Sequence, residues 1–170
     1  MSDANSRSIV SNQAGIHEKL DEIVNKHLDA EFKKPIAAHT QTAFDEVNAK
    51  VQAFSGPLIL DSCCGVGESS ANLAKRHPDA LIVGIDKSSH RLDKHDVEYK
   101  RWHGAAIFPF IVKLGGKFEV RSNWDIYVKE FARALELTGN PCDVTLYESD
   151  DAITPFERKY WASGQQSHRL

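Results

Sequence analysis

The chain has 170 residues, of which 41% are hydrophobic, and a formal net charge of −3. This length and composition indicate one domain with a buried core, and the charge excludes nucleic-acid binding through an overall basic surface. The three cysteines lack zinc-ligand spacing, and no apolar run reaches the roughly 18 residues of a membrane span. We therefore expect a cytoplasmic protein with reduced thiols, no metal site and no membrane segment.

Two helices are predicted before the first strand. Apolar residues recur at helical spacing between residues 14 and 30, and again from Phe44 to Phe54. Pro35 separates the two segments, and Ser55-Gly-Pro57 ends the second. We interpret residues 1–54 as an N-terminal helical extension and residues 55–170 as the main domain, packed together as one compact unit.

Two apolar runs that each end in an aspartate form the centre of the sequence. Leu58–Leu60 predicts a buried strand followed by Asp61, and Leu81–Ile85 predicts a second strand followed by Asp86. In open α/β sheets, ligands bind outside the carboxyl ends of the strands. We therefore expect the two aspartates at the mouth of a nucleoside-binding half-site.

A glycine turn and a helix connect these strands. Gly65 and Gly67 suit a backbone that turns tightly or approaches a ligand closely. Ser69 and Ser70 predict the start of a helix over residues 71–77. The alternative is a generic strand–helix–strand unit in which the aspartates only cap or turn the chain.

The acid before the glycines indicates the kind of nucleoside. A dinucleotide fingerprint needs a third glycine, and Ser70 occupies that position, so a nicotinamide enzyme is a weaker alternative. The Asp61 carboxylate would repel a pyrophosphate and would suit a cationic ligand such as S-adenosylmethionine. Asp86 would accept hydrogen bonds from both ribose hydroxyls, because an ionised carboxylate has two acceptor oxygens.

The rest of the chain is predicted to alternate helices and strands after a polar stretch that begins at residue 87. The expected elements are a short helix over residues 105–114, a strand over 118–122, a helix over 126–137, a strand over 143–147 and an aromatic-basic segment over 154–161, before a polar tail.

Several short motifs match one known family in the same order. The cofactor turn has its acid and its Gly-Glu-Ser, with Cys63 where the family has a first glycine. Asn123-Trp124 ends a strand that in the family usually ends Thr-Asp-Trp, and Thr154-Pro-Phe-Glu157 matches a Thr-Lys-Phe-Glu motif. From about residue 35 to 161, the chain resembles the bacterial tRNA (guanine-N7)-methyltransferases, close to their methyltransferase-like branch.

The resemblance implies an α/β fold with a Rossmann-like class I methyltransferase sheet, S-adenosylmethionine as the cofactor and tRNA as the partner. The implied cofactor-binding residues are Asp61, Gly65, Gly67 and Asp86, and the implied substrate-binding residues are Asn123, Thr154, Phe156 and Glu157. Candidate phosphate contacts are Lys100, Arg101, Lys113, Lys117, Arg121, Arg158 and Lys159.

The chain departs from the family in its middle. The family has two more strands between the ribose acid and the Gly115-Gly116 turn, and the second of them ends in the catalytic-loop motif. Neither strand is found here, so no catalytic residue is assigned and the sheet is expected to be shortened. The strand over residues 118–122 would then pair with Leu58–Leu60 directly, or the sheet would have a gap. We expect a tRNA (guanine-N7)-methyltransferase or, alternatively, a non-catalytic remnant that binds cofactor or RNA weakly.

Overall fold

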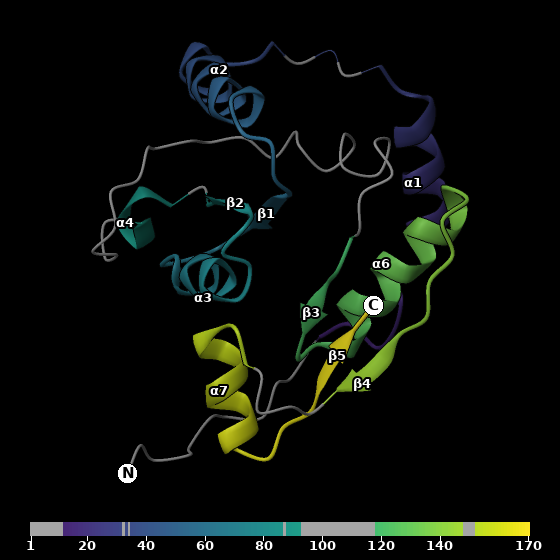
Figure 1. The fold of residues 1–170 in the computed structure, drawn as a ribbon. Helices are drawn as coiled ribbons and strands as arrows, with labels where there is room; N and C mark the ends of the chain where they lie inside the picture. Colours follow the sequence, from purple (N-terminus) through teal and green to yellow (C-terminus); the bar gives the residue numbers. More distant parts are fainter. Residues whose placement is uncertain (1–11, 32, 34, 87, 93–117, 148–151) are drawn as a thin grey trace. The chain divides into compact units, whose positions relative to one another are not determined.

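The computed structural model describes residues 12–31, 33, 35–86, 88–92, 118–147 and 152–170 (Figure 1). Contacts divide the chain into two compact units, which are described separately. The first comprises residues 34–116 and 153–155, and the second comprises residues 1–33, 117–152 and 156–170. The predicted boundary between residues 54 and 55 does not coincide with this division and stays a prediction.

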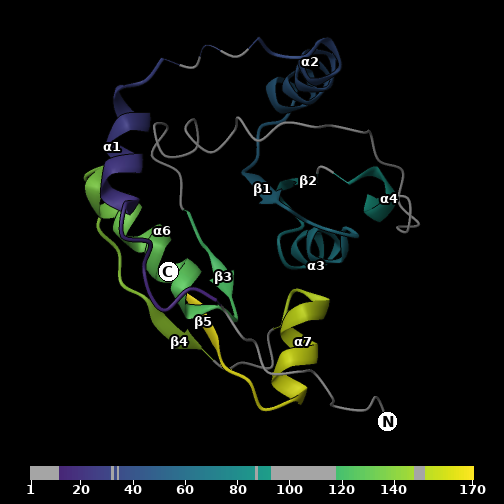
Figure 2. The same cartoon turned by 180° about the vertical axis from the view of Figure 1, so that it is seen from behind.

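The centre of the first unit is a parallel pair of strands. β1 (Leu58–Ser62) pairs with β2 (Leu81–Ile85) in the register Leu58 with Leu81 through Ser62 with Ile85. The helix α3 (Glu68–Arg76) connects the two strands and lies beside them in both ribbon views (Figures 1 and 2). The predicted strand–turn–helix–strand unit is therefore present, although the helix begins three residues earlier than expected.

The described part of the first unit contains two further helices. α2 (Ala38–Gln52) precedes β1, and the short α4 (Ser89–Leu92) follows β2 within the stretch that was predicted only as polar. The small side chain of Ala43 is buried against Ile85, whereas Phe44 is 46% exposed. The packed face of α2 therefore contains Ala43 and the predicted Val47 and Val51, which are half-buried, and it leaves the predicted Phe44 exposed.

The second unit contains two helices that are distant in sequence. α1 (Leu20–Asp29) packs against α6 (Asp125–Leu137), and Arg133 donates to both carboxylate oxygens of Asp21 at 3.0 and 2.5 Å. Val128 of α6 is completely buried. The N-terminal helix is thus packed on the C-terminal half of the chain, and it is shorter than the predicted 14–30 segment.

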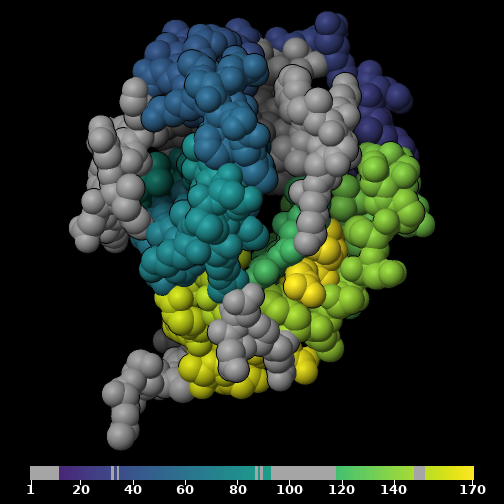
Figure 3. Space-filling view, viewed as in Figure 1, coloured from purple at the N-terminus to yellow at the C-terminus, as the bar shows by residue number. Residues whose placement is uncertain are grey.

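A small antiparallel sheet completes the second unit. Its order is β3 (Arg121–Ser122), β5 (Ser167–Arg169) and β4 (Thr145–Tyr147), so the predicted polar tail forms the central strand. In the space-filling view, yellow C-terminal residues lie against green residues that come earlier in the chain (Figure 3). α7 (Pro155–Ala162) corresponds to the aromatic-basic segment.

The described residues form a mixed α/β structure with two small sheets. We expected a shortened sheet in which the strand over residues 118–122 either pairs with β1 directly or is separated from it by a gap. Among the described residues, β1 pairs with β2 alone, and β3 pairs with β5. β5 supplies the backbone partners that β3 needs, so the direct pairing of β3 with β1 is not formed. The helix predicted over residues 105–114 lies outside the described residues.

None of the helices formed by the described residues is both long enough and apolar enough to cross a membrane.

Candidate functional site

The Asp61 carboxylate lies near the carboxyl end of β1, beside the first turn of α3. The hydroxyls of Ser69 and Ser70 both donate to its Oδ2 atom, at 2.6 and 2.7 Å. Among the described residues, no hydrogen-bond donor contacts the other oxygen, Oδ1. The two serines were predicted to cap the helix, but Gly67 is the N-cap residue, and no side chain caps the helix. Asp61 therefore keeps one oxygen able to accept from a ligand.

The turn between β1 and α3 is built from left-handed residues. Gly65 and Gly67 have φ values of 62° and 83°, and Cys63 has a φ of 64°. Glycine adopts this conformation without a steric penalty, whereas a residue with a Cβ adopts it only at a cost in free energy. Cys63 stands where the resembled family has a glycine, and its backbone conformation is one that favours glycine. The glycines of the turn are required by conformation, as the sequence predicted.

Replacement of Cys63 tests this backbone strain. A left-handed non-glycine residue costs roughly 1–2 kcal/mol, and glycine costs about 0.5–1 kcal/mol through the entropy of the unfolded chain. We expect Cys63→Gly to raise the free energy of unfolding by up to about 1 kcal/mol, and Cys63→Val to lower it. Urea denaturation measures both. Cys142→Gly is the control, because Cys142 is exposed and is not left-handed; a gain in that variant as well would contradict the explanation.

Asp86 is buried and connects the turn to the end of β2. Its Oδ2 accepts from the backbone N–H of Gly65 at 3.0 Å, and its Oδ1 accepts from the N–H of Ser88 at 2.7 Å. The residue is 4% exposed, and the guanidinium of Arg91 lies 3.7 Å from Oδ2. Both carboxylate oxygens therefore bind the protein's own backbone, and a ribose would have to share them.

The two aspartates lie near the same end of the strand pair. Asp61 is paired with Gly84, and Asp86 follows Gly84 by two residues, just beyond the end of β2. The buried thiol of Cys64 lies near both acids: burial, assisted by the charges of Asp61 and Asp86, raises its pKa to about 11. The thiol therefore stays protonated at neutral pH and is not a nucleophile.

Gly84 is a residue of this site that the sequence analysis did not single out. A Cβ atom at this position would lie 2.4 Å from Ser70 Oγ and 3.1 Å from Cys64 Sγ. β2 thus approaches α3 so closely that only glycine fits between them. A glycine inside a strand often marks such a close approach, so the signal was present in the sequence.

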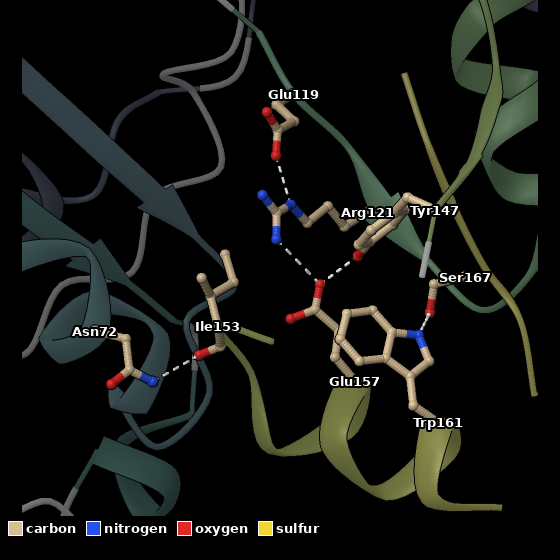
Figure 4. A network of polar contacts seen from close by, with 8 residues as sticks. All are labelled: Asn72, Glu119, Arg121, Tyr147, Ile153, Glu157, Trp161 and Ser167. Carbon is tan, nitrogen blue, oxygen red and sulfur yellow. Dashed lines mark hydrogen bonds and ion pairs between the residues drawn. The ribbon is translucent and has the colours of Figure 1, made fainter. Parts of the chain in front are cut away.

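Glu157, a predicted substrate contact, belongs to a polar network of the second unit (Figure 4). Its carboxylate accepts from the Tyr147 hydroxyl and from Arg121 Nη1 at 3.4 Å, and the residue is 6% exposed. Nearby, the Trp161 indole N–H donates to Ser167 Oγ at 2.9 Å. The described interactions of Glu157 join α7 to the sheet. They give its buried carboxylate hydrogen-bond partners within the protein, so no substrate is needed to explain its position.

Tyr147 gives a pH-dependent prediction. Burial and the Glu157 carboxylate raise the pKa of the Tyr147 phenol above its usual value. The folded protein therefore holds this proton more tightly than the unfolded chain does. Its contribution to stability is complete below the unfolded pKa of about 10 and is lost as the pH rises through the folded pKa.

We expect the free energy of unfolding to fall between about pH 10 and pH 12, and to fall less in Tyr147→Phe. Urea denaturation across this range measures the difference. Tyr127→Phe is the control, since the Tyr127 side chain is 48% exposed. An identical pH dependence in wild type and Tyr147→Phe would refute the assignment.

The other predicted substrate residues have different surroundings. The Asn123 Nδ2 atom is buried and has no hydrogen-bond partner among the described residues, so it could still donate to a ligand. Phe156 is exposed and stacks on Tyr160 with 6.3 Å between ring centroids. Thr154 belongs to the first unit, whereas the other three belong to the second.

The candidate phosphate contacts also differ in their surroundings. Arg121 binds Glu119 and Glu157, and Arg158 and Lys159 are exposed on α7. The remaining candidates lie outside the described residues: Lys100, Arg101, Lys113 and Lys117.

Comparison with known proteins finds a partial likeness to a methyltransferase. Over 72 residues the chain is 31% identical to O-methyltransferase rstn1 of Aspergillus nomiae. The matched region is 42% of this chain and 32% of that protein, so the chain spans about a third of the relative's length. No protein-family profile matches the chain, and no solved structure matches it. The chain is thus similar in part to a methyltransferase. This comparison gives no support for the narrower tRNA (guanine-N7) family.

Proposed function

We propose that this protein binds S-adenosylmethionine at the carboxyl end of the β1–β2 pair and transfers its methyl group. The observation that carries the proposal is the Asp61 carboxylate, which has one oxygen without a donor among the described residues and lies beside a left-handed turn. The partial similarity to an O-methyltransferase supports the same class of reaction.

The chemistry of the residues fits one end of this cofactor. A carboxylate attracts a cation and repels a phosphate, and S-adenosylmethionine carries a sulfonium and an ammonium but no phosphate. A Cβ atom added to Gly65 would have no heavy atom of the described residues within 4 Å, so these residues leave space on that side of the turn. At Asp86 the fit is poorer, because both oxygens already accept backbone N–H groups.

For the acceptor we propose guanine N7 in tRNA, on the strength of the resemblance alone. N7 is nucleophilic without losing a proton, so the protein's task would be to orient it toward the sulfonium methyl. Proximity and orientation can supply about 7–11 kcal/mol of such a barrier. The buried Asn123 Nδ2, which has no partner within the part of the chain that the structure describes, could donate to the base. The resemblance assigns Thr154, Phe156 and Glu157 to the nucleotide, and Glu157 would have to exchange its present partners for the base.

The second candidate is a protein that binds the cofactor or RNA weakly without catalysis. It is favoured by one observation, namely that the described partners of Asp86 and Glu157 already engage both carboxylates within the protein. A protein of this kind would keep the fold around the turn and would lack the free acceptor oxygens that orient a ribose and a base.

Titration calorimetry and a transfer assay separate the two candidates. We expect micromolar binding of S-adenosylmethionine and incorporation of labelled methyl groups into unmodified tRNA, at guanine N7. Binding without transfer to tRNA, even with a large excess of protein, would favour the non-catalytic protein. Transfer to a hydroxyl compound in place of tRNA would support methyltransferase activity and would show that the proposed acceptor is wrong. No binding at millimolar cofactor would overturn the proposal.

A further inference from the structure

We infer that Ser69, Ser70 and Gly84 are positioning residues, which hold the Asp61 carboxylate so that Oδ1 faces the cationic part of the cofactor. The inference rests on the proposed function, because it concerns the orientation of the same carboxylate. It goes further by assigning a role to three residues outside the predicted set of cofactor contacts.

The first support is that two donors converge on one oxygen. Both serine hydroxyls donate to Oδ2, at 2.6 and 2.7 Å, and Ser69 is only 4% exposed. A carboxylate held by two hydrogen bonds at one oxygen cannot rotate freely about its Cβ–Cγ bond. The serines are adjacent residues in the first turn of α3, so the helix itself sets the direction of Oδ1.

The second support is the space that Gly84 provides. Gly84 is the register partner of Asp61, and a Cβ at this position would lie 2.4 Å from Ser70 Oγ and 3.3 Å from Ser70 Cβ. Glycine in β2 therefore allows the Ser70 hydroxyl to lie between the strand and the helix. Alanine would displace this hydroxyl and with it one of the two bonds to Asp61.

A purely structural role for the serines makes a different prediction from a positioning role. If they only pack α3 against the strands, their loss would weaken every ligand of the site alike. If they orient a negative charge toward a cation, their loss would weaken a cationic ligand much more than a neutral one. S-adenosylmethionine and adenosine are a suitable pair, because they share the nucleoside and differ in the charged part.

The binding experiment therefore measures both ligands with Ser69→Ala and Ser70→Ala. We expect each variant to bind S-adenosylmethionine about tenfold more weakly, as for the loss of a hydrogen bond to a charged group, and to bind adenosine as wild type does. The matched control is Ser62→Ala, because the Ser62 hydroxyl is exposed and its described hydrogen bond is to Cys63 Sγ, at 3.9 Å. Equal weakening of both ligands, or no change in either, would overturn the positioning role.

A second experiment needs no ligand and so remains informative if the proposed function fails. Gly84→Ala is measured by urea denaturation in the wild-type and Ser70→Ala backgrounds. We expect a large loss of stability in the wild-type background and a clearly smaller loss in Ser70→Ala, because the nearest clashing oxygen is absent there. Equal losses would overturn the arrangement of Gly84, Ser70 and Asp61. If wild type binds no S-adenosylmethionine, the proposed function and the positioning role are both wrong. The comparison of Gly84→Ala in the two backgrounds then still tests the packing of Gly84 against Ser70.

Discussion

Replacement of Asp61 by alanine is expected to weaken S-adenosylmethionine binding about 100-fold, since a hydrogen bond to a charged group contributes about 1.5–3 kcal/mol. The loss has two sources. The variant removes the Oδ1 atom that we propose as the cofactor's acceptor, and it leaves the Ser69 and Ser70 hydroxyls without their common partner. Titration calorimetry measures the affinity, and circular dichroism confirms that the variant is folded.

Asp61→Asn separates the charge of this side chain from its shape. Asparagine keeps the size and one acceptor oxygen but carries no negative charge, so we expect most of the loss to remain. The control is Asp79→Ala, because Asp79 is an exposed acid just before β2, at the opposite end of the strand from Asp86. Wild-type affinity in both Asp61 variants would mean that this carboxylate does not contact the cofactor.

Replacement of Asp86 by alanine is expected to lower the free energy of unfolding by about 2 kcal/mol, because each half-buried donor left without a partner costs about 1 kcal/mol, the lower end of the penalty for a buried one. The two donors are the backbone N–H groups of Gly65 and Ser88. Arg91 contributes little, since its side chain is 61% exposed and lies 3.7 Å away. Urea denaturation measures the loss, with Asp79→Ala as the control.

Asp86→Asn distinguishes the structural role of this residue from the ribose contact predicted for it. Asparagine keeps one acceptor oxygen, so we expect about half of the stability loss, and the protein can be studied in its folded state. An adenosine affinity that falls in this folded variant supports the ribose contact. An unchanged affinity would show that Asp86 only holds the turn. A stability equal to wild type in Asp86→Ala would contradict the structural role.

The local elements of the first unit could be predicted because their signals are local. An apolar run, a glycine turn and a helix start in that order are sufficient to predict β1, α3 and β2, and the structure contains all three. The need for glycine at Gly65 and Gly67 also followed from the sequence, because a tight turn requires a left-handed backbone at a few positions.

Pairing and partners were decided by the tertiary structure. The residues of β5 are polar and carry no strand pattern, and they form a strand because β3 and β4 offer backbone donors and acceptors on either side. The single sheet that we expected depended on which strand reaches which edge, and local periodicity does not contain that information. The pairing of Arg133 with Asp21, 112 residues apart, likewise depends on how α1 and α6 pack.

The sequence by itself determined the carboxylates, the glycines and their order along the chain. Only the tertiary structure decided which of these groups keep an atom available for a ligand. Asp61 and Asp86 look equivalent in sequence, since each ends a strand. They differ because Asp86 lies within reach of two backbone N–H groups and is buried, whereas two serine hydroxyls bind a single oxygen of Asp61. A hydrogen bond depends on distance and direction in space, and these arise only when the turn, the helix and both strands are packed together.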